Sequence, residues 1–440
     1  MRLHIILGTA LGTLAMAAGG YLIGEKSGLE QGLRRRQEAS SERLSPVLSF
    51  DRASAEASPY TASEEEIADE TARLRSIGGL VLPKRLYVVA GHPIEIYWRT
   101  VVLARDPEVF LYSVNCTCDF VSNERRRIAL KPPADASGRH SLEIALANTT
   151  GKTLTRDSME IVVVPRSAGE NSAFEMLMIG DSLGHQSRFP NRLAELFSIP
   201  GNPKVTFVGS HKPGGAEIQH EHYSGWRFSY FTTIFGQDPN RYHRDRSPFV
   251  FGVVDGKPLV NVQRYLDETL KGTRPRNVHI QLGINDAFLL SPEDPYLDNE
   301  LNSVIDDAEA LISALKKALP EAVVTVGSVI QANATDRAYI ESYRDDRRLH
   351  SEWRWRQVQM RLARRMVKHF EQTGDRKVYL VPTHMTVDPL DGYSAHVWTP
   401  EHVEYNVSNA VHPSPVGDKQ LATAIFAVVK GELVGLLGPN

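Results

Sequence analysis

Residues 176–183 read MLMIGDSL, and this stretch defines the architecture of the C-terminal part of the chain. The four apolar residues at its start are typical of a strand that helices cover on both faces. Similar apolar runs recur at 205–208, 278–282, 323–326 and 378–381. Apolar residues at helical spacing extend from Leu301 to Leu319 between two of these runs, and Pro320 ends that helix. This alternation predicts a doubly wound parallel sheet, with ligands at the carboxyl ends of its strands.

The second half of the quoted stretch places a serine at that ligand edge. Gly180 allows a tight turn directly after the strand, and the turn lifts Ser182 out of the sheet, where a nucleophile belongs. A simpler interpretation is that Asp181 and Ser182 only cap the helix that contains Phe189, Leu193, Leu196 and Phe197. The serine alone does not decide between the two interpretations.

Three further polar blocks favour the nucleophile. Gly283-Ile-Asn-Asp286 follows the third strand and brings an amide side chain, and His222-Tyr-Ser-Gly-Trp226 offers the backbone N–H of Gly225. His412 lies just before the last helix, which begins at Ser414-Pro415. Acyl transfer needs a nucleophile, a base and donors for the developing oxyanion. Ser182, His412 and a donor set made of the Ser182 N–H, the Gly225 N–H and the Asn285 side chain would supply all three.

In this order the four blocks resemble the SGNH (GDSL) hydrolase superfamily, which has a flavodoxin-like sheet. The resemblance covers roughly residues 174–437, and residues 223–228 and 409–413 are similar to those of an exported bacterial branch of SGNH esterases. It implies that Ser182 is the nucleophile and His412 the base. It also implies that Gly225 and Asn285 complete the oxyanion hole, with Asp181 in support.

One position departs from the family pattern. The family usually carries Asp three residues before its histidine, and Asn409 stands there in this chain. An amide oxygen can orient an imidazole but brings no charge to stabilise the imidazolium. We expect another carboxylate or a backbone carbonyl to orient His412, and therefore expect Asn409→Asp to change activity little. The candidate carboxylates are Asp388, Asp391, Glu401 and Glu404.

Residues 77–168 show a different pattern. Short runs rich in β-branched and aromatic residues are separated by Gly, Pro, Asn and Asp turns, at 85–89, 94–98, 110–114, 141–145 and 159–164. They predict a small β-sandwich that folds alone and contributes no catalytic group. Cys116 and Cys118 lie in or beside one strand, where about 6.6 Å of rise would separate them, so we expect two semi-buried thiols.

The N-terminal residues 1–24 are predicted to be a signal peptide or a membrane anchor. Arg2 precedes an apolar run from Ile5 to Ile23 that contains an A-x-A site at Ala15–Ala17. The run is nearly long enough to span a bilayer, so an uncleaved anchor stays open. A polar linker is expected over 25–76, and the SGNH domain over 169–440.

Composition excludes several other classes of protein. Of the 440 residues, 42% are hydrophobic and 23% are charged, which is too apolar for a largely disordered chain. A net charge of −3 argues against a nucleic-acid binder. We expect no cofactor and no metal, because the histidines at 211, 220, 222, 384, 396 and 402 show no metal-ligand spacing. The basic stretch 344–369 is interpreted as a solvated helix face rather than a binding patch.

Together these features predict an exported serine esterase that acts on an O-acetyl carbohydrate or a short acyl ester. The predicted partner is this ester substrate, including acetylated polysaccharide, and contact with a membrane is expected only through an uncleaved N-terminal segment. An O-acyltransferase with the same covalent intermediate is one alternative. A catalytically weakened glycan-binding surface protein is the other, supported by Asn409 alone.

Overall fold

The computed structural model describes residues 79–213, 218–235, 246–371, 377–393, 397–398, 403–404 and 409–437. The predicted signal or anchor segment and the polar linker lie outside these residues. No helix in the described ranges is long and apolar enough to cross a membrane.

A parallel sheet forms the centre of the C-terminal part. Its strands are β8 (Ala173–Gly180), β9 (Lys204–Val208), β10 (Glu221–His222), β13 (Asn277–Gln281), β14 (Val323–Gly327) and β15 (Val378–Val381). Strands β9 and β10 pair in turn with the first and last residues of β8, so the order is β9/β10–β8–β13–β14–β15. This is the flavodoxin-like order 2-1-3-4-5. The predicted doubly wound sheet is confirmed.

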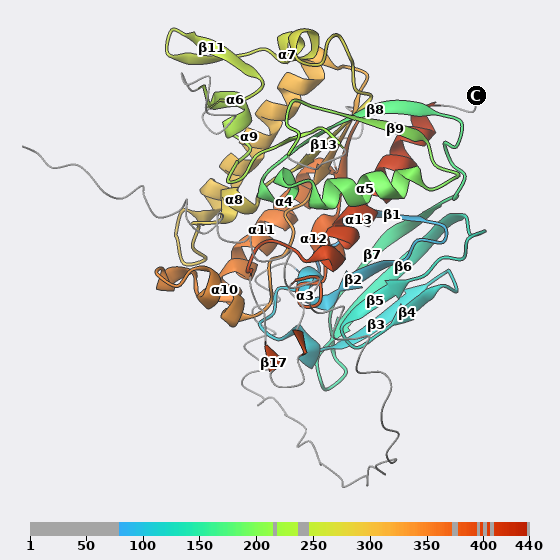
Figure 1. The fold of residues 1–440 in the computed structure, drawn as a ribbon. Coiled ribbons are helices and arrows are strands. Elements are labelled where there is room, and N and C mark those ends of the chain that lie inside the picture. The colour runs from blue at the N-terminus through green and yellow to red at the C-terminus, as the bar shows by residue number, and fades with distance from the viewer. Residues whose placement is uncertain are drawn as a thin grey trace, which may run out of the picture. The chain divides into compact units, whose positions relative to one another are not determined.

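Helices cover both faces of this sheet (Figure 1). Helix α5 (Arg188–Ser198) packs against α13 (Pro415–Leu437), and α9 (Leu297–Ala318) packs against α11 (Glu352–Phe370). The predicted apolar stripe of α9 is buried, and α11 buries Val358, Leu362 and Phe370 as predicted. The expected solvated face of α11 is wrong, because Met360 and Val367 are also buried, against Val81 and Leu103, and only Lys368 of the helix is exposed. The shorter helices are α4 (Ser182–His185), α6 (Tyr230–Thr233), α7 (Val262–Glu268), α8 (Ile284–Ala287), α10 (Asp336–Ser342) and α12 (Thr383–Thr386), with 3-10 turns at Arg347–Leu349 and Pro107–Val109. Two small hairpins pair β11 (Val250–Val254) with β12 (Lys257–Val260) and β16 (Val397–Trp398) with β17 (Val403–Glu404).

The N-terminal part is a small sandwich of two sheets. One sheet has the order β1 (Arg85–Val89), β7 (Thr153–Val164), β6 (Gly138–Ala147) and β3 (Leu111–Cys116). The other has the order β2 (Ile94–Tyr97), β5 (Arg127–Leu130) and β4 (Val121–Asn123). Strands β4 and β5 were not predicted, because each is too short to show alternation. The predicted strand 94–98 ends one residue early, where the turn α3 (Trp98–Val101) begins.

The two cysteines form a disulfide, so the expectation of free thiols is wrong. Strand β3 ends at Cys116, and the chain leaves its extended path there. The Cα atoms of Cys116 and Cys118 are consequently 5.1 Å apart, within reach of an S–S bond.

The sandwich and the parallel sheet share one hydrophobic core. Residues of both parts belong to one cluster of buried side chains, and the described residues fall into one compact unit, Ala62–Asn440. Tyr87 of β1 donates a hydrogen bond of 2.6 Å to Glu432 of α13. The backbone oxygen of Val81 lies 3.1 Å from Nε2 of the buried His384. This packing argues against the expectation that residues 80–165 fold alone.

Candidate active site

The serine turn lies at the carboxyl end of the central strand β8. Strand β8 ends at Gly180, and Asp181 accepts a 2.9 Å hydrogen bond from the backbone N–H of Leu183. Ser182 is thus the first residue of the short helix α4, while α5 begins only at Arg188. Asp181 therefore caps α4 and not the helix that contains Phe189 and Phe197, so the capping interpretation is wrong for that helix, and the Ser182 hydroxyl stays available for chemistry.

His412 meets that hydroxyl. Its Nε2 lies 2.9 Å from Oγ of Ser182, although 230 residues separate the two in the sequence. His412 is brought there by the loop that leads into α13. Hydrogen-bond contact between a hydroxyl and an imidazole is the geometry by which a base activates a serine.

Asn409 lies behind His412. Its side-chain oxygen is 3.1 Å from Nδ1 of His412. The same oxygen accepts hydrogen bonds of 3.0 Å from the backbone N–H groups of Val411 and His412. These two backbone donors show that the oxygen of the amide, and not its NH₂ group, faces the imidazole, because an NH₂ group cannot accept a hydrogen bond. Nδ1 must therefore carry the proton, which leaves Nε2 free to accept one.

We expected another carboxylate to orient His412, and this is wrong for Asp388 and Asp391, the two candidates whose side chains the structure describes. Asp388 and Asp391 are engaged by Arg126, at 3.0 and 3.2 Å. Glu401 lies outside the described residues, and the side chain of Glu404 is also outside them. Asn409 itself occupies the position, three residues before His412, and its amide oxygen needs no charge to accept a hydrogen bond.

The proposed oxyanion donors come from two neighbouring loops. Gly225 is exposed and has a φ of +80°, a backbone conformation that residues other than glycine rarely adopt. Asn285 donates a 2.9 Å hydrogen bond from Nδ2 to the carbonyl of Trp226, next to Gly225. Asp286 accepts a 3.3 Å hydrogen bond from the backbone N–H of Phe228. Asn285 and Asp286, which follow β13, therefore hold the Gly225 loop through two hydrogen bonds, and the second N–H of Asn285 can donate to a ligand.

The charges around the site favour a neutral base. Burial, together with repulsion from Arg188, lowers the pKa of His412 to about 4. Burial raises the pKa of Asp181 to about 8 and that of Asp286 to about 7. A neutral Asp181 beside the serine turn does not oppose an oxyanion that forms there.

Arg188 and Asp418 were not identified from the sequence. Nε of Arg188 lies 3.0 Å from Oδ2 of Asp418, in the first turn of α13. The sequence does not reveal this ion pair, because an Arg and an Asp that are far apart in the sequence belong to no recognisable motif. Asp286 belongs to a block that was recognised, but its bond to the Gly225 loop was not predicted.

The histidines do not assemble a metal site in the described part of the chain. There, no group of three or more His, Cys, Asp or Glu side chains is placed to hold an ion. His220 lies 2.7 Å from Oγ of Ser187, and the rings of His185 and His211 stack at 4.6 Å. His384 contacts Ser328 at 2.8 Å. His396 and His402 lie outside the described residues.

Comparisons with known proteins find similar folds among solved structures. A family 3 carbohydrate esterase from Clostridium thermocellum matches at 15% identity and a TM-score of 0.37, over 61% of this chain and 100% of that one. An acetylxylan esterase from Geobacillus stearothermophilus matches at 15% identity and a TM-score of 0.31, over 58% and 94%. No family model and no curated protein matches the sequence.

At these identities and TM-scores the matches indicate no function for this chain. The sheet order, the serine turn and the approach of His412 to Ser182 are those that the resemblance implies. The chain has a doubly wound, flavodoxin-like α/β fold, preceded by a β domain.

Proposed function

We propose that the protein is a serine esterase that works through an acyl-enzyme intermediate. The observation that carries this proposal is the 2.9 Å contact between Oγ of Ser182 and Nε2 of His412. The proton on Nδ1 of His412, which Asn409 accepts, leaves Nε2 as the basic nitrogen. A weakened, purely glycan-binding protein would have no need to keep this alignment.

The reaction follows from these positions. Ser182 gives its proton to Nε2 of His412 as Oγ attacks the ester carbonyl carbon. The carbonyl oxygen becomes an oxyanion, held by the N–H groups of Ser182 and Gly225 and by Nδ2 of Asn285. The C–O bond to the alcohol then breaks, and the imidazolium returns the proton to the leaving oxygen. Water repeats the sequence on the acyl-serine, releasing the acid and restoring the hydroxyl.

We propose an O-acetyl carbohydrate or another short acyl ester as substrate. Gly225 and Ser224 are exposed, so a bulky alcohol portion has access to the site. Cavities of about 550, 400 and 400 Å³ among the described residues are lined by neither Ser182 nor His412.

Export from the cytoplasm belongs to the same proposal. The signal or anchor pattern at 1–24 supports it, and so does the Cys116–Cys118 disulfide, because such bonds persist mainly in oxidising compartments.

Product analysis tests the proposed function. The purified protein is incubated with acetylated xylan, 4-nitrophenyl acetate and 4-nitrophenyl octanoate, with Ser182→Ala as control. Acetate release by the wild type, with the octanoate a poorer substrate, is expected. Transfer of acetyl to an added sugar in place of acetate release would support the acyltransferase alternative. No acyl chemistry on any ester would overturn the proposal.

A further inference from the structure

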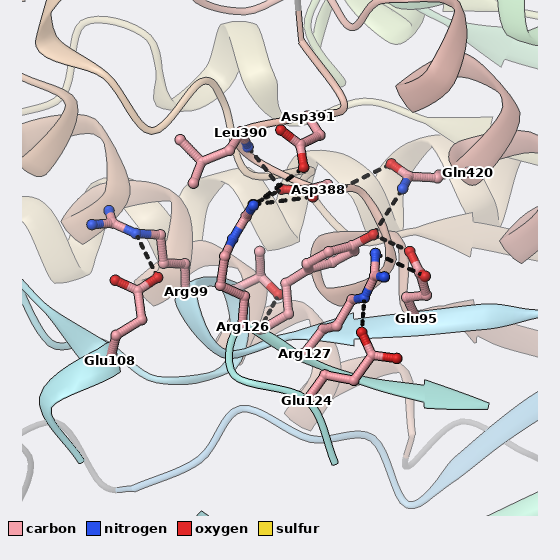
Figure 2. A network of polar contacts seen from close by, with 12 residues as sticks. Glu95, Arg99, Glu108, Glu124, Arg126, Arg127, Asp388, Leu390, Asp391 and Gln420 are labelled. Atoms are coloured by element: carbon pink, nitrogen blue, oxygen red, sulfur yellow. Dashed lines mark hydrogen bonds and ion pairs between the residues drawn. The ribbon is translucent and has the colours of Figure 1, made fainter. Parts of the chain in front are cut away.

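An arginine of the β domain reaches the C-terminal part of the chain near the catalytic histidine. Arg126 lies in the turn between β4 and β5, and its Nη2 contacts Oδ1 and Oδ2 of Asp388 at 3.0 and 3.2 Å (Figure 2). Its Nη1 contacts Asp391 at 3.2 Å. The Asp388 side chain is only 2% exposed, whereas that of Asp391 is 73% exposed. Arg126 therefore neutralises a buried carboxylate of the other domain.

Asp388 organises a tight turn. Its Oδ1 accepts a 2.8 Å hydrogen bond from the N–H of Leu390, and its backbone oxygen accepts one of 3.0 Å from Gly392. Its own N–H donates to Oε1 of Gln420 at 2.9 Å, as Figure 2 shows. Gln420 in turn donates to the hydroxyl of Tyr97, on β2, at 2.8 Å. The turn 388–392 thus contacts the β domain directly through Arg126 and is linked to Tyr97 indirectly, through Gln420 of α13.

The same turn supports the segment that carries His412. The carbonyl of Gly392 accepts a 2.9 Å hydrogen bond from Ser414, two residues after the histidine. A Cβ on Gly417 would lie 2.2 Å from that carbonyl, so the turn packs directly on the start of α13. On the other side of His412, the carbonyl of Ala410 accepts a 2.8 Å bond from Asn333, and the adjacent Ala334 donates to Pro389 at 2.8 Å. Both flanks of His412 are therefore tied to residues 388–392.

We propose that Arg126 is a positioning residue for His412, so that the β domain sets the geometry of the catalytic pair through Asp388 and Gly392. This inference rests on the proposed esterase function and adds a part of the chain to its active site. A displacement of about 1 Å in a catalytic group can cost about a hundredfold in rate, so the anchoring of this segment matters even though Arg126 touches no substrate. The prediction that the β domain contributes no catalytic group is compatible with this role, because a positioning residue acts through other residues.

The test compares Arg126→Met with Arg139→Met. Arg139 also belongs to the β domain and forms an ion pair, but its partner is Glu160 of β7, at 2.8 Å. For Arg126→Met we expect kcat on 4-nitrophenyl acetate to fall about tenfold or more with KM unchanged, because Asp388 loses its partner and the turn relaxes. Each kcat is referred to the number of serines that a fluorophosphonate titrates, so loss of folded protein does not count. Arg139→Met should keep the wild-type kcat.

A second variant separates positioning from loss of charge alone. Arg126→Met combined with Asp388→Asn removes the unpaired carboxylate and keeps an oxygen for the N–H of Leu390. We expect this double variant to stay as slow as Arg126→Met, because the contact with the β domain is still missing. Arg126→Lys should recover part of the lost kcat, since a lysine supplies charge without the planar guanidinium. Full recovery in the double variant would show that only the unpaired charge lowers kcat, and would overturn the positioning role.

A measurement that does not depend on catalysis completes the experiment. The titration of His412 is followed by NMR in a Ser182→Ala background, where Arg126→Met should shift it and Arg139→Met should not. If the wild type hydrolyses no ester but this shift occurs, the proposed function fails and the positioning role stands. If the wild type is active while Arg126→Met changes neither kcat nor the His412 titration relative to Arg139→Met, the inference is overturned.

Discussion

The side-chain oxygen of Asn409 lies 3.1 Å from Nδ1 of His412 and is held there by two backbone N–H groups. When an amide replaces the acid of a serine triad, activity can fall by about four orders of magnitude, largely because the amide stabilises the wrong tautomer. In this chain the backbone N–H groups of Val411 and His412 keep the amide oxygen toward Nδ1 and so prevent the wrong tautomer. A neutral residue therefore orients the base correctly and lacks only the negative charge.

The first prediction concerns Asn409 itself. Asn409→Ala removes the acceptor, so kcat on a small ester should fall about a hundredfold or more. Asn409→Asp keeps the acceptor and adds charge behind the imidazolium. It should raise kcat by about tenfold, equal to one pKa unit of stabilisation, and not by four orders. This replaces the expectation of no change, which assumed another orienting group. Equal kcat values for the wild type and Asn409→Ala would contradict the account.

The second prediction is a pH dependence to which burial and Arg188 both contribute. Burial and the Arg188 charge lower the pKa of His412 to about 4, so the base form is present above that pH and is lost as the pH falls through it. Arg188→Gln removes the repulsion and leaves Asp418 without its ion-pair partner. Losing the repulsion stabilises the imidazolium, so the acid limb of kcat/KM should move up by roughly one pH unit. Asp418 adds no charge effect at that pH, because burial raises its pKa to about 6 and leaves it protonated there.

Arg192→Gln is the control for Arg188. It lies on the same helix and pairs with Glu195 at 2.8 Å, so its profile should overlay that of the wild type. An acid limb that moves down, or stays in place, in Arg188→Gln would show that Arg188 does not act on His412.

The third prediction addresses the oxyanion donors. Asn285→Ala removes one N–H from the expected oxyanion position and the bond to Trp226. Loss of one such donor typically costs a hundred- to a thousandfold in kcat, about 3–4 kcal/mol. We expect that loss with little change in KM, because the donor acts mainly on the transition state. A rise in KM with unchanged kcat would instead assign Asn285 to substrate binding.

The fourth prediction concerns the shared core. A protein beginning at Gly169 lacks the sandwich, including Tyr87 and Arg126, and exposes the face of α13 that packs on β1. It should be insoluble or melt more than about 10 °C below the full chain, as expected for a loss of several kcal/mol. A protein beginning at Ala62 keeps the whole compact unit and should retain the melting temperature and kcat of the full chain. A soluble Gly169 fragment that melts cooperatively with wild-type kcat would refute the shared core.

Much of the α/β part was predictable because its signals are local. Continuous apolar runs such as 176–179 mark buried parallel strands, and the stripe of α9 marks a helix, since each pattern reflects burial on known faces. The same sheet then places Ser182 and Asn285 at one edge, whatever the loops between them do. Strands β4 and β5 were missed because three or four residues carry too little periodicity.

Contacts between distant segments were beyond prediction. Nothing in the sequence pairs Arg126 with Asp388, or Arg188 with Asp418, because an ion pair depends on tertiary packing and not on spacing. The disulfide was missed for a related reason. An ideal strand separates Cys116 from Cys118 too widely, and only the end of β3 brings them within reach.

Labelling of the active serine is the most direct test of the central claim, that Ser182 is a nucleophile activated by His412. The intact mass of the full-length protein is measured after reaction with a fluorophosphonate at pH 7, beside Ser182→Ala and His412→Ala. The account predicts one adduct per chain in the wild type, located on Ser182 by peptide mapping. It also predicts none in Ser182→Ala and labelling slowed by at least about a hundredfold in His412→Ala. An unlabelled wild type, or equal labelling in Ser182→Ala, would contradict it.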